Sequence, residues 1–195
     1  MKHVIIGAGV AGITAAKTIK EIDKDAEVVV IGDEMFLPYK RYLLTEFLCG
    51  KVTQEDLIFF PMESLKELDI KLRMGESVKT IQSSKKSIKL LHNEIVNYDK
   101  LLIATGCIPS LGLVLRPFKN CIRYYYSLND ILVLKNKLPE IQNCVVFGKG
   151  VSSLDLISGL HNLGKQITYI TKGKRAHFGL RETRSEEHTS ELQSH

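Results

Sequence analysis

The chain has 195 residues, of which 44% are hydrophobic and 25% are charged, with a formal net charge of +5. This profile is typical of a globular protein and excludes a disordered chain, which would have fewer apolar residues and less balanced charge. No apolar run reaches the ~18 residues that a membrane-spanning helix needs, so no membrane association is expected. The basic residues are spread along the chain rather than clustered in a stripe, so nucleic acid is not an expected partner.

The sequence opens with a strand–helix–strand pattern. Residues 3–6 form a short apolar run that predicts a buried strand. Residues 12–22 carry apolar side chains at helical spacing and predict a helix, and residues 27–31 (EVVVI) predict a second buried strand. Two strands joined in this way form a βαβ unit, and such units build parallel sheets.

The next part of the chain departs from this pattern. Short helices are predicted over 45–48 and 62–68, on either side of Pro61. Four short segments separated by turn residues then predict a β-meander that ends in an apolar strand at 101–104. These four segments span 70–74, 77–81, 87–91 and 94–98.

The opening pattern returns after a connection over 107–140. That connection is punctuated by prolines and predicts one helix near 128–138, with Ser127 or Asn129 as its cap. A strand, a glycine-rich turn, a helix and a further strand follow. Their predicted bounds are 144–147 for the strand, 148 for the start of the turn, 153–163 for the helix and 166–170 for the last strand.

The predicted fold class is therefore α/β, with two units in tandem. Residues 1–110 are expected to form a Rossmann-like dinucleotide-binding module with a β-meander, and 111–183 a connection and the start of a second such module. Residues 184–195 (RSEEHTSELQSH) have no strand or helix periodicity and resemble the translation of a sequencing adapter. We expect this tail to be non-native and the natural protein to continue beyond Thr183.

The first glycine motif has the form G-x-G-x-x-G, with glycines at 7, 9 and 12. Gly7 permits a tight turn, Gly9 lets the backbone approach a pyrophosphate, and Gly12 lets the helix pack closely on the strand. The helix N-terminus offers free N–H groups to phosphates. The acids Asp33 and Glu34 follow the second strand, where a carboxylate would accept hydrogen bonds from ribose hydroxyls. The motif predicts dinucleotide binding, and the alternative is a glycine-rich turn with solvated acids.

The second motif, GKGVSS at 148–153, carries Ser153 in place of the third glycine. Serine is small enough to pack there, so nicotinamide nucleotide binding is also predicted for this unit. The residues after the last strand, KGKR at 172–175, supply no acid for a 2′-hydroxyl. A basic cluster favours a 2′-phosphate and hence NADPH over NADH, with a solvated basic loop as the alternative.

Four segments together resemble the pyridine nucleotide-disulfide oxidoreductase superfamily. They are GAGVAG at 7–12, GDEMFLPYKR at 32–41, YDKLLIATG at 98–106 and GKGVSS at 148–153. Within that superfamily, the sequence resembles rubredoxin and ferredoxin reductases and the flavin portion of the nitrite reductase large subunit. The resemblance implies FAD in the first module and NAD(P)H in the second.

It also implies the flow of electrons, from NAD(P)H through FAD to a small electron-carrier protein or a downstream redox centre. Glu34 would hold the adenosine ribose, Arg41 would lie beside the flavin's phosphates, and Asp155 would lie near the nicotinamide. No catalytic residue and no metal site is assigned. The residues expected to bind the two cofactors are Gly7, Ala8, Gly9, Ala11, Gly12, Asp33, Glu34, Arg41, Ala104, Thr105, Gly106, Gly148, Gly150, Ser153 and Asp155.

Two other functions stay open. Cys49 would be a redox thiol in an NADH oxidase or disulfide reductase, although a small buried apolar side chain is the favoured interpretation. The degenerate second motif would also suit a regulatory module that binds dinucleotide without chemistry. The four cysteines, at 49, 107, 121 and 144, contain no C-x-x-C pair, so a reducing cytoplasm is the expected compartment. The tyrosine run 124–126 is expected to pack at an interface rather than stack on bases.

Overall fold

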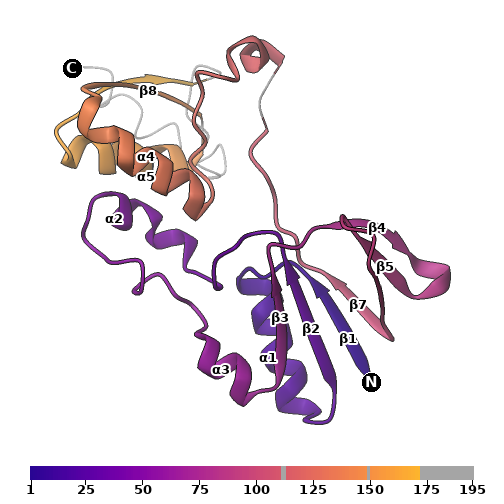
Figure 1. The fold of residues 1–195 in the computed structure, drawn as a ribbon. Helices are drawn as coiled ribbons and strands as arrows, with labels where there is room; N and C mark the ends of the chain where they lie inside the picture. Colours follow the sequence, from indigo (N-terminus) through magenta and orange to yellow (C-terminus); the bar gives the residue numbers. More distant parts are fainter. Residues whose placement is uncertain (111–112, 149, 172–195) are drawn as a thin grey trace, which may run out of the picture.

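The computed structural model describes residues 1–110, 113–148 and 150–171. Its first unit is built on a parallel sheet with the strand order β3-β2-β1-β7 (Figure 1). The strands are β1 (Lys2–Ile6), β2 (Glu27–Gly32), β3 (Ile70–Met74) and β7 (Lys100–Ile103). The predicted βαβ unit is present: β1 and β2 are joined by α1 (Val10–Ile22) and pair in parallel.

The two faces of this sheet are covered by different layers. Because successive side chains of a strand point to opposite faces, Ile5 packs with Ile13 of α1, whereas Val4 and Ile6 pack on the other side. That other side is covered by a three-stranded antiparallel sheet, and its Ile88 is buried against Val4. This sheet consists of β4 (Val78–Gln82), β5 (Ser87–Leu90) and β6 (Ile95–Asn97).

The meander prediction is wrong for its first segment. Ile70–Met74 is not an antiparallel neighbour of β4 but pairs in parallel with β2, with Ile70 opposite Val28. The reason is burial: Ile70 and Leu72 join the core beneath α1, and α3 (Met62–Glu67) supplies the crossover that a parallel strand requires. The other three segments form the antiparallel meander as predicted.

The second unit begins with α4 (Leu128–Lys137). Ser127 and Asp130 form a reciprocal capping box at its start, so Ser127 is the cap. After α4 come β8 (Asn143–Phe147), α5 (Val151–Asn162) and β9 (Gln166–Ile170), with β8 and β9 paired in parallel. Four short 3₁₀ helices complete the described secondary structure. They are η1 (Arg41–Leu43), η2 (Ser83–Lys85), η3 (Leu113–Phe118) and η4 (Leu138–Glu140).

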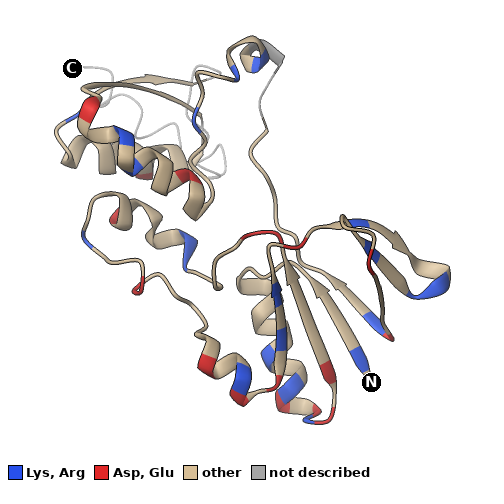
Figure 2. Cartoon of the chain, viewed as in Figure 1, with Lys and Arg blue, Asp and Glu red and all other residues tan. Residues whose placement is uncertain are grey.

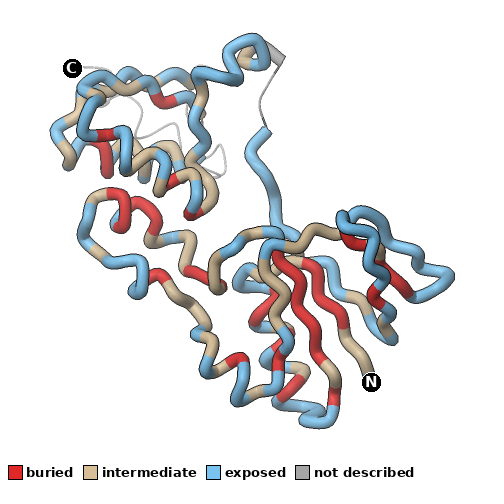
Figure 3. The backbone as a smooth tube through the Cα atoms, viewed as in Figure 1, coloured by how far each residue is buried: buried red, intermediate tan, exposed pale blue. Residues whose placement is uncertain are grey.

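One segment of the first half of the chain packs into the second unit. The short helix α2 (Leu44–Leu48) lies against α4 and α5, and most of its backbone tube has the colour of buried residues in Figure 3. Phe47 and Leu48 share a core with Ile131 of α4 and Leu160 of α5. The hydrophobic core shared by α2, α4 and α5 therefore connects the two halves of the chain, in addition to the covalent connection between them.

The charged side chains follow no single stripe. Lys and Arg occur on both units with acids interspersed among them (Figure 2). Within the described ranges, none of the helices combines the length and the hydropathy of a membrane-spanning segment.

Candidate nucleotide sites

The first glycine loop joins the end of β1 to the start of α1 and is closely packed at two of its glycines. Gly7 has a φ of 111°, a conformation that side chains rarely adopt. A β-carbon on Gly7 would collide with the carbonyl oxygen of Ala104, and one on Gly12 with the carbonyl oxygen of Gly7. Both positions therefore need glycine for the fold itself, and at Gly12 the reason is the close helix packing predicted.

Gly9 differs from its neighbours because the space around it is open. A β-carbon there would have no atom within 4 Å. Gly9 is the N-cap of α1, no side chain caps the helix, and its first turn carries no acid. The N–H groups of a helix's first turn have no partner within the helix and attract anions. The space and the uncapped helix end fit a pyrophosphate.

The acid pair follows β2 beside this loop. Gly32, at the end of β2, lies against Ala8 of the loop, since a β-carbon on Gly32 would lie 2.7 Å from the Ala8 β-carbon. Glu34 is partly buried, and its carboxylate accepts a hydrogen bond of 2.7 Å from the Tyr39 hydroxyl. Asp33 is exposed. Of the two acids, Glu34 therefore has the more fixed side chain.

Arg41 completes the surroundings of Glu34. Its guanidinium forms an ion pair with Glu34 and lies 4.9 Å from the centre of the Tyr39 ring. On the side of the second unit, it donates a hydrogen bond of 2.9 Å to the carbonyl of Tyr126. The pKa of the Tyr39 hydroxyl is raised, chiefly by burial and also by the hydrogen bond to Glu34, so the hydroxyl stays protonated and donates.

The end of β7 meets the glycine loop from the other side. The Ala104 N–H donates to the Ile6 carbonyl at 2.7 Å, which places Ala104 and Thr105 beside the end of β1. Gly106 follows with a φ of 67°. The structure thus brings the three predicted segments of the first site together at the carboxyl edge of the parallel sheet. Ligands of open α/β sheets bind at this edge.

The second glycine loop repeats these features between β8 and α5. Gly150 is the N-cap of α5, with no side-chain cap, no acid in the first turn and no atom within 4 Å of an added β-carbon. Ser153 stands at the position of the third glycine, and its hydroxyl fills the space where Gly148 would carry a β-carbon. Ser152 and Ser153 also line a cavity of 570 Å³ between α5, β8 and the connection. Residues 172–175, on which the NADPH preference depends, lie outside the described residues.

Asp155 connects the second site to α2. Its carboxylate accepts hydrogen bonds from the hydroxyls of Thr45 and Tyr125, the latter at 3.3 Å. Burial, together with the charge of Asp155, raises the pKa of Tyr125 to about 12. In the described contacts Asp155 bridges the two halves of the chain, and its role beside a nicotinamide stays a prediction.

Cys49 has the surroundings of a packing residue. Its thiol lies 3.4 Å from the Gly159 carbonyl of α5, and burial raises its pKa. Because the thiolate is the reactive form of cysteine, a raised pKa works against a redox role at neutral pH.

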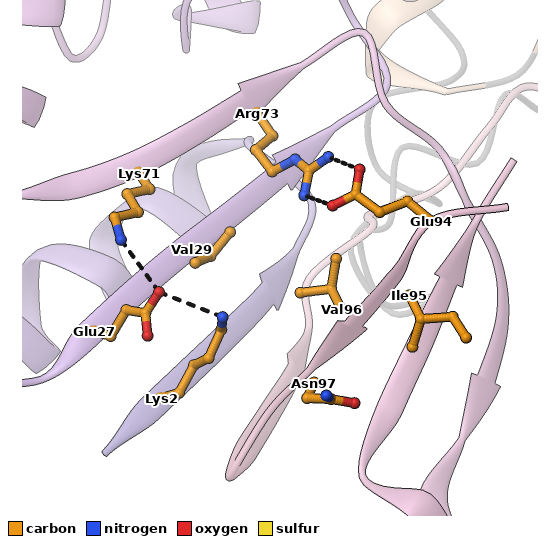
Figure 4. Close-up of a pocket in the computed structure, with 9 residues that line it drawn as sticks. All are labelled: Lys2, Glu27, Val29, Lys71, Arg73, Glu94, Ile95, Val96 and Asn97. Carbon is orange, nitrogen blue, oxygen red and sulfur yellow. Dashed lines mark hydrogen bonds and ion pairs between the residues drawn. The ribbon is translucent and has the colours of Figure 1, made fainter. Parts of the chain in front are cut away.

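Figure 4 shows the residues that line a second cavity, of 360 Å³. It opens between the parallel sheet and β6, and its cationic side chains are already paired. Lys2 and Lys71 both contact Glu27, and Arg73 contacts Glu94 at 2.7 Å. No residue of either glycine loop lines this cavity, so it has no helix N-terminus to offer a nucleotide phosphate.

Sequence reasoning missed the residues that join the segments of the site. Tyr39, Thr45, Tyr125 and Tyr126 hold Glu34, Arg41 and Asp155 in the described contacts. Tyr39 lies inside the segment GDEMFLPYKR, and Tyr125 and Tyr126 belong to the run 124–126, for which packing at an interface was predicted without a partner. No sequence pattern indicated the contact of Thr45.

The sequence matches the family described as pyridine nucleotide-disulphide oxidoreductase over residues 1–195. The chain belongs to this family. Membership confirms the resemblance drawn from the four motifs, and with it FAD and NAD(P)H as the cofactors of the family.

The chain is also similar to individual reductases in sequence and in structure. The chain is 29% identical over 167 residues to the ferredoxin–NAD(+) reductase component of the 3-phenylpropionate/cinnamic acid dioxygenase of Photorhabdus laumondii, covering 86% of this chain and 42% of that protein. The structure of NADH:rubredoxin oxidoreductase from Clostridium acetobutylicum matches with a TM-score of 0.78 and 26% identity, over 87% of this chain and 44% of that one. The covalent putidaredoxin reductase–putidaredoxin complex matches with a TM-score of 0.83 and 25% identity, over 90% and 43%. The chain spans less than half the length of each of these proteins.

Proposed function

We propose that the protein is an FAD-dependent oxidoreductase that takes hydride from NAD(P)H. The electrons would pass to a small carrier protein such as rubredoxin or ferredoxin, or to a downstream redox centre. The observation that carries the proposal is the pairing of two open glycine positions, Gly9 and Gly150, each at the uncapped start of a helix. Two such helix ends suit the pyrophosphates of two dinucleotides.

The residues of the first site would bind and orient FAD. The α1 N-terminus and the open space at Gly9 would accept the pyrophosphate, and Glu34 would accept hydrogen bonds from the adenosine ribose. Arg41, which is already ordered between Glu34 and Tyr126, would lie near the phosphates. Bound FAD supplies the chemistry, because flavins accept hydride and pass electrons onward.

The second site would hold NAD(P)H. The α5 N-terminus and Gly150 would accept its pyrophosphate beside Ser152 and Ser153, at the wall of the 570 Å³ cavity. The names of the similar proteins, which include ferredoxin and rubredoxin reductases, support a carrier protein as the electron acceptor. A role for Cys49 in an oxidase or disulfide reductase has less support, because the thiol is packed against Gly159.

Anaerobic titration of the full-length protein tests the proposal. The purified protein should carry yellow flavin, and NADH or NADPH should bleach it. Oxidised rubredoxin or ferredoxin should then restore the colour. Absence of flavin, or flavin that neither nucleotide bleaches, overturns the proposal. Tight NAD(P)H binding without bleaching would favour the regulatory module instead.

A further inference from the structure

The tyrosine run 124–126 lies where the connection between the two units ends. The chain leaves the first unit after β7, which ends at Ile103, and enters α4 through the cap residue Ser127 (Figure 1). The Tyr126 hydroxyl donates a hydrogen bond to the carbonyl of Cys107, directly after that exit. A single side chain therefore ties the end of the connection to its beginning.

The same residue contacts the arginine of the first site. The Arg41 guanidinium lies 4.6 Å from the centre of the Tyr126 ring, and its Nη1 donates to the Tyr126 carbonyl at 2.9 Å. Tyr39 provides a second ring at 4.9 Å, so the guanidinium has an aromatic contact from each half of the chain. A cation over an aromatic ring is attracted by the ring's electrons, and arginine is the commonest partner.

These contacts leave Arg41 able to bind an anion. A guanidinium has five N–H donors. The described hydrogen bonds use only Nη1 and Nη2, toward Tyr126 and Glu34. A long side chain that is ordered before binding loses less conformational freedom when its ligand arrives, so ordering improves affinity.

The other two tyrosines of the run differ. The Tyr125 hydroxyl contacts Asp155 and Thr45, on the side of the second unit. Tyr124 is 39% exposed. Only Tyr126 has described contacts to both Arg41 and the exit of the first unit, and Tyr124 offers a matched control.

We propose that Tyr126 is a positioning residue with two functions: its ring orders Arg41 for FAD, and its hydroxyl fixes the exit of the first unit. The first function rests on the proposed FAD site, whereas the second does not. The connection thereby contributes to the flavin site as well as linking the units.

FAD affinity tests the ring. In the full-length protein freed of flavin, Tyr126→Leu should weaken FAD about tenfold, and Tyr126→Phe, which keeps the ring, should stay within about twofold of wild type. Tyr124→Leu should also leave FAD affinity unchanged. Tyr126→Leu should have little further effect in an Arg41→Lys background, because residues acting through one contact are not additive. The role of the ring would be overturned if Tyr126→Leu and Tyr126→Phe lost FAD affinity equally. It would also be overturned if the loss in the double variant equalled the product of the losses in the two single variants.

Trypsin tests the hydroxyl without any cofactor. The connection exposes cleavage sites at Lys119 and Arg123. Tyr126→Phe should be cut there several-fold faster than wild type or Tyr124→Phe, because the bond to Cys107 is lost. Unchanged cleavage overturns this role even if Tyr126→Leu fails to fold. Wild-type protein that binds no FAD would instead contradict the proposed function. The trypsin comparison would still show whether the Tyr126 hydroxyl fixes the exit of the first unit.

Discussion

Gly12 of α1 lies so close to the carbonyl group of Gly7 that not even a methyl group fits between them. This contact fixes the start of the helix against the end of β1, and so fixes the direction in which the first N–H groups of α1 point. In the proposed FAD site, the third glycine of the motif would therefore act on the cofactor through the fold. Gly9, between them, has no such neighbour.

Substitutions at these two glycines should therefore separate cofactor binding from stability. Gly9→Val should lower the unfolding temperature of the flavin-free protein less than Gly12→Ala does, since the Gly9 backbone is extended and an added β-carbon has no atom within 4 Å. FAD affinity should fall by at least about tenfold, because the side chain occupies the phosphate position. Gly12→Ala should lower the free energy of unfolding by about 1–3 kcal/mol, as overpacking does. Calorimetry measures the stability of the two variants, and titration with FAD measures their FAD affinity. Unchanged FAD affinity in Gly9→Val would contradict the proposed FAD site.

The acids after β2 should contribute unequally. Glu34→Gln should weaken FAD about tenfold, because a carboxylate ordered by Tyr39 and Arg41 is replaced by a neutral amide. Asp33→Asn is the matched control, since this side chain is exposed, and should change the affinity by less than about twofold. A larger loss from Asp33→Asn than from Glu34→Gln would assign the ribose contact to the other acid.

The contact between α2 and α5 should matter for stability rather than for redox chemistry. A β-carbon on Gly159 would lie 2.6 Å from Thr45 Cγ2 and 3.3 Å from the Cys49 thiol. Gly159→Ala should therefore lower the free energy of unfolding by about 1–3 kcal/mol.

Cys49→Ser at the same contact should leave NAD(P)H-dependent turnover within about twofold of wild type, because the thiol acts by packing. Steady-state kinetics on the full-length protein measure this. Loss of turnover with FAD content intact would restore the redox interpretation of Cys49.

Local sequence patterns predicted much of this structure. The features that they did not predict depend on contacts between residues far apart in the sequence. The strand over 27–31 was recognisable because apolar β-branched runs are typical of buried parallel strands. The strand over 166–170 was recognisable from its β-branched and aromatic residues, although none of its five residues is buried. Ile70–Met74 was misassigned because its alternation of apolar and polar residues fits either kind of sheet. Its pairing with β2 depends on the burial of Ile70 in the core beneath α1, which the local pattern does not show. The contact of Arg41 with Tyr126 spans 85 positions, and no local pattern indicates it.

The ion pair of Arg73 and Glu94 should make stability depend on pH in the acid range. Arg73, and to a smaller extent His92, lower the pKa of Glu94 to about 2. In the unfolded chain this pKa is about 4.3. A lowered pKa in the folded state means that the contribution is fully present above about pH 4.3 and is lost as the pH falls toward about 2.

Glu94→Gln should consequently lower the unfolding temperature at neutral pH, by no more than a few degrees because the pair is exposed to solvent. The difference from wild type should shrink as the pH falls through the acid range, since Glu94 itself becomes neutral. Glu55→Gln, at an exposed acid on another surface, is the control and should show no such convergence. Thermal unfolding followed by circular dichroism at neutral pH and at about pH 3 distinguishes these outcomes. A Glu94→Gln difference that stays constant across that range would mean that the pair does not stabilise the fold through the charge of Glu94.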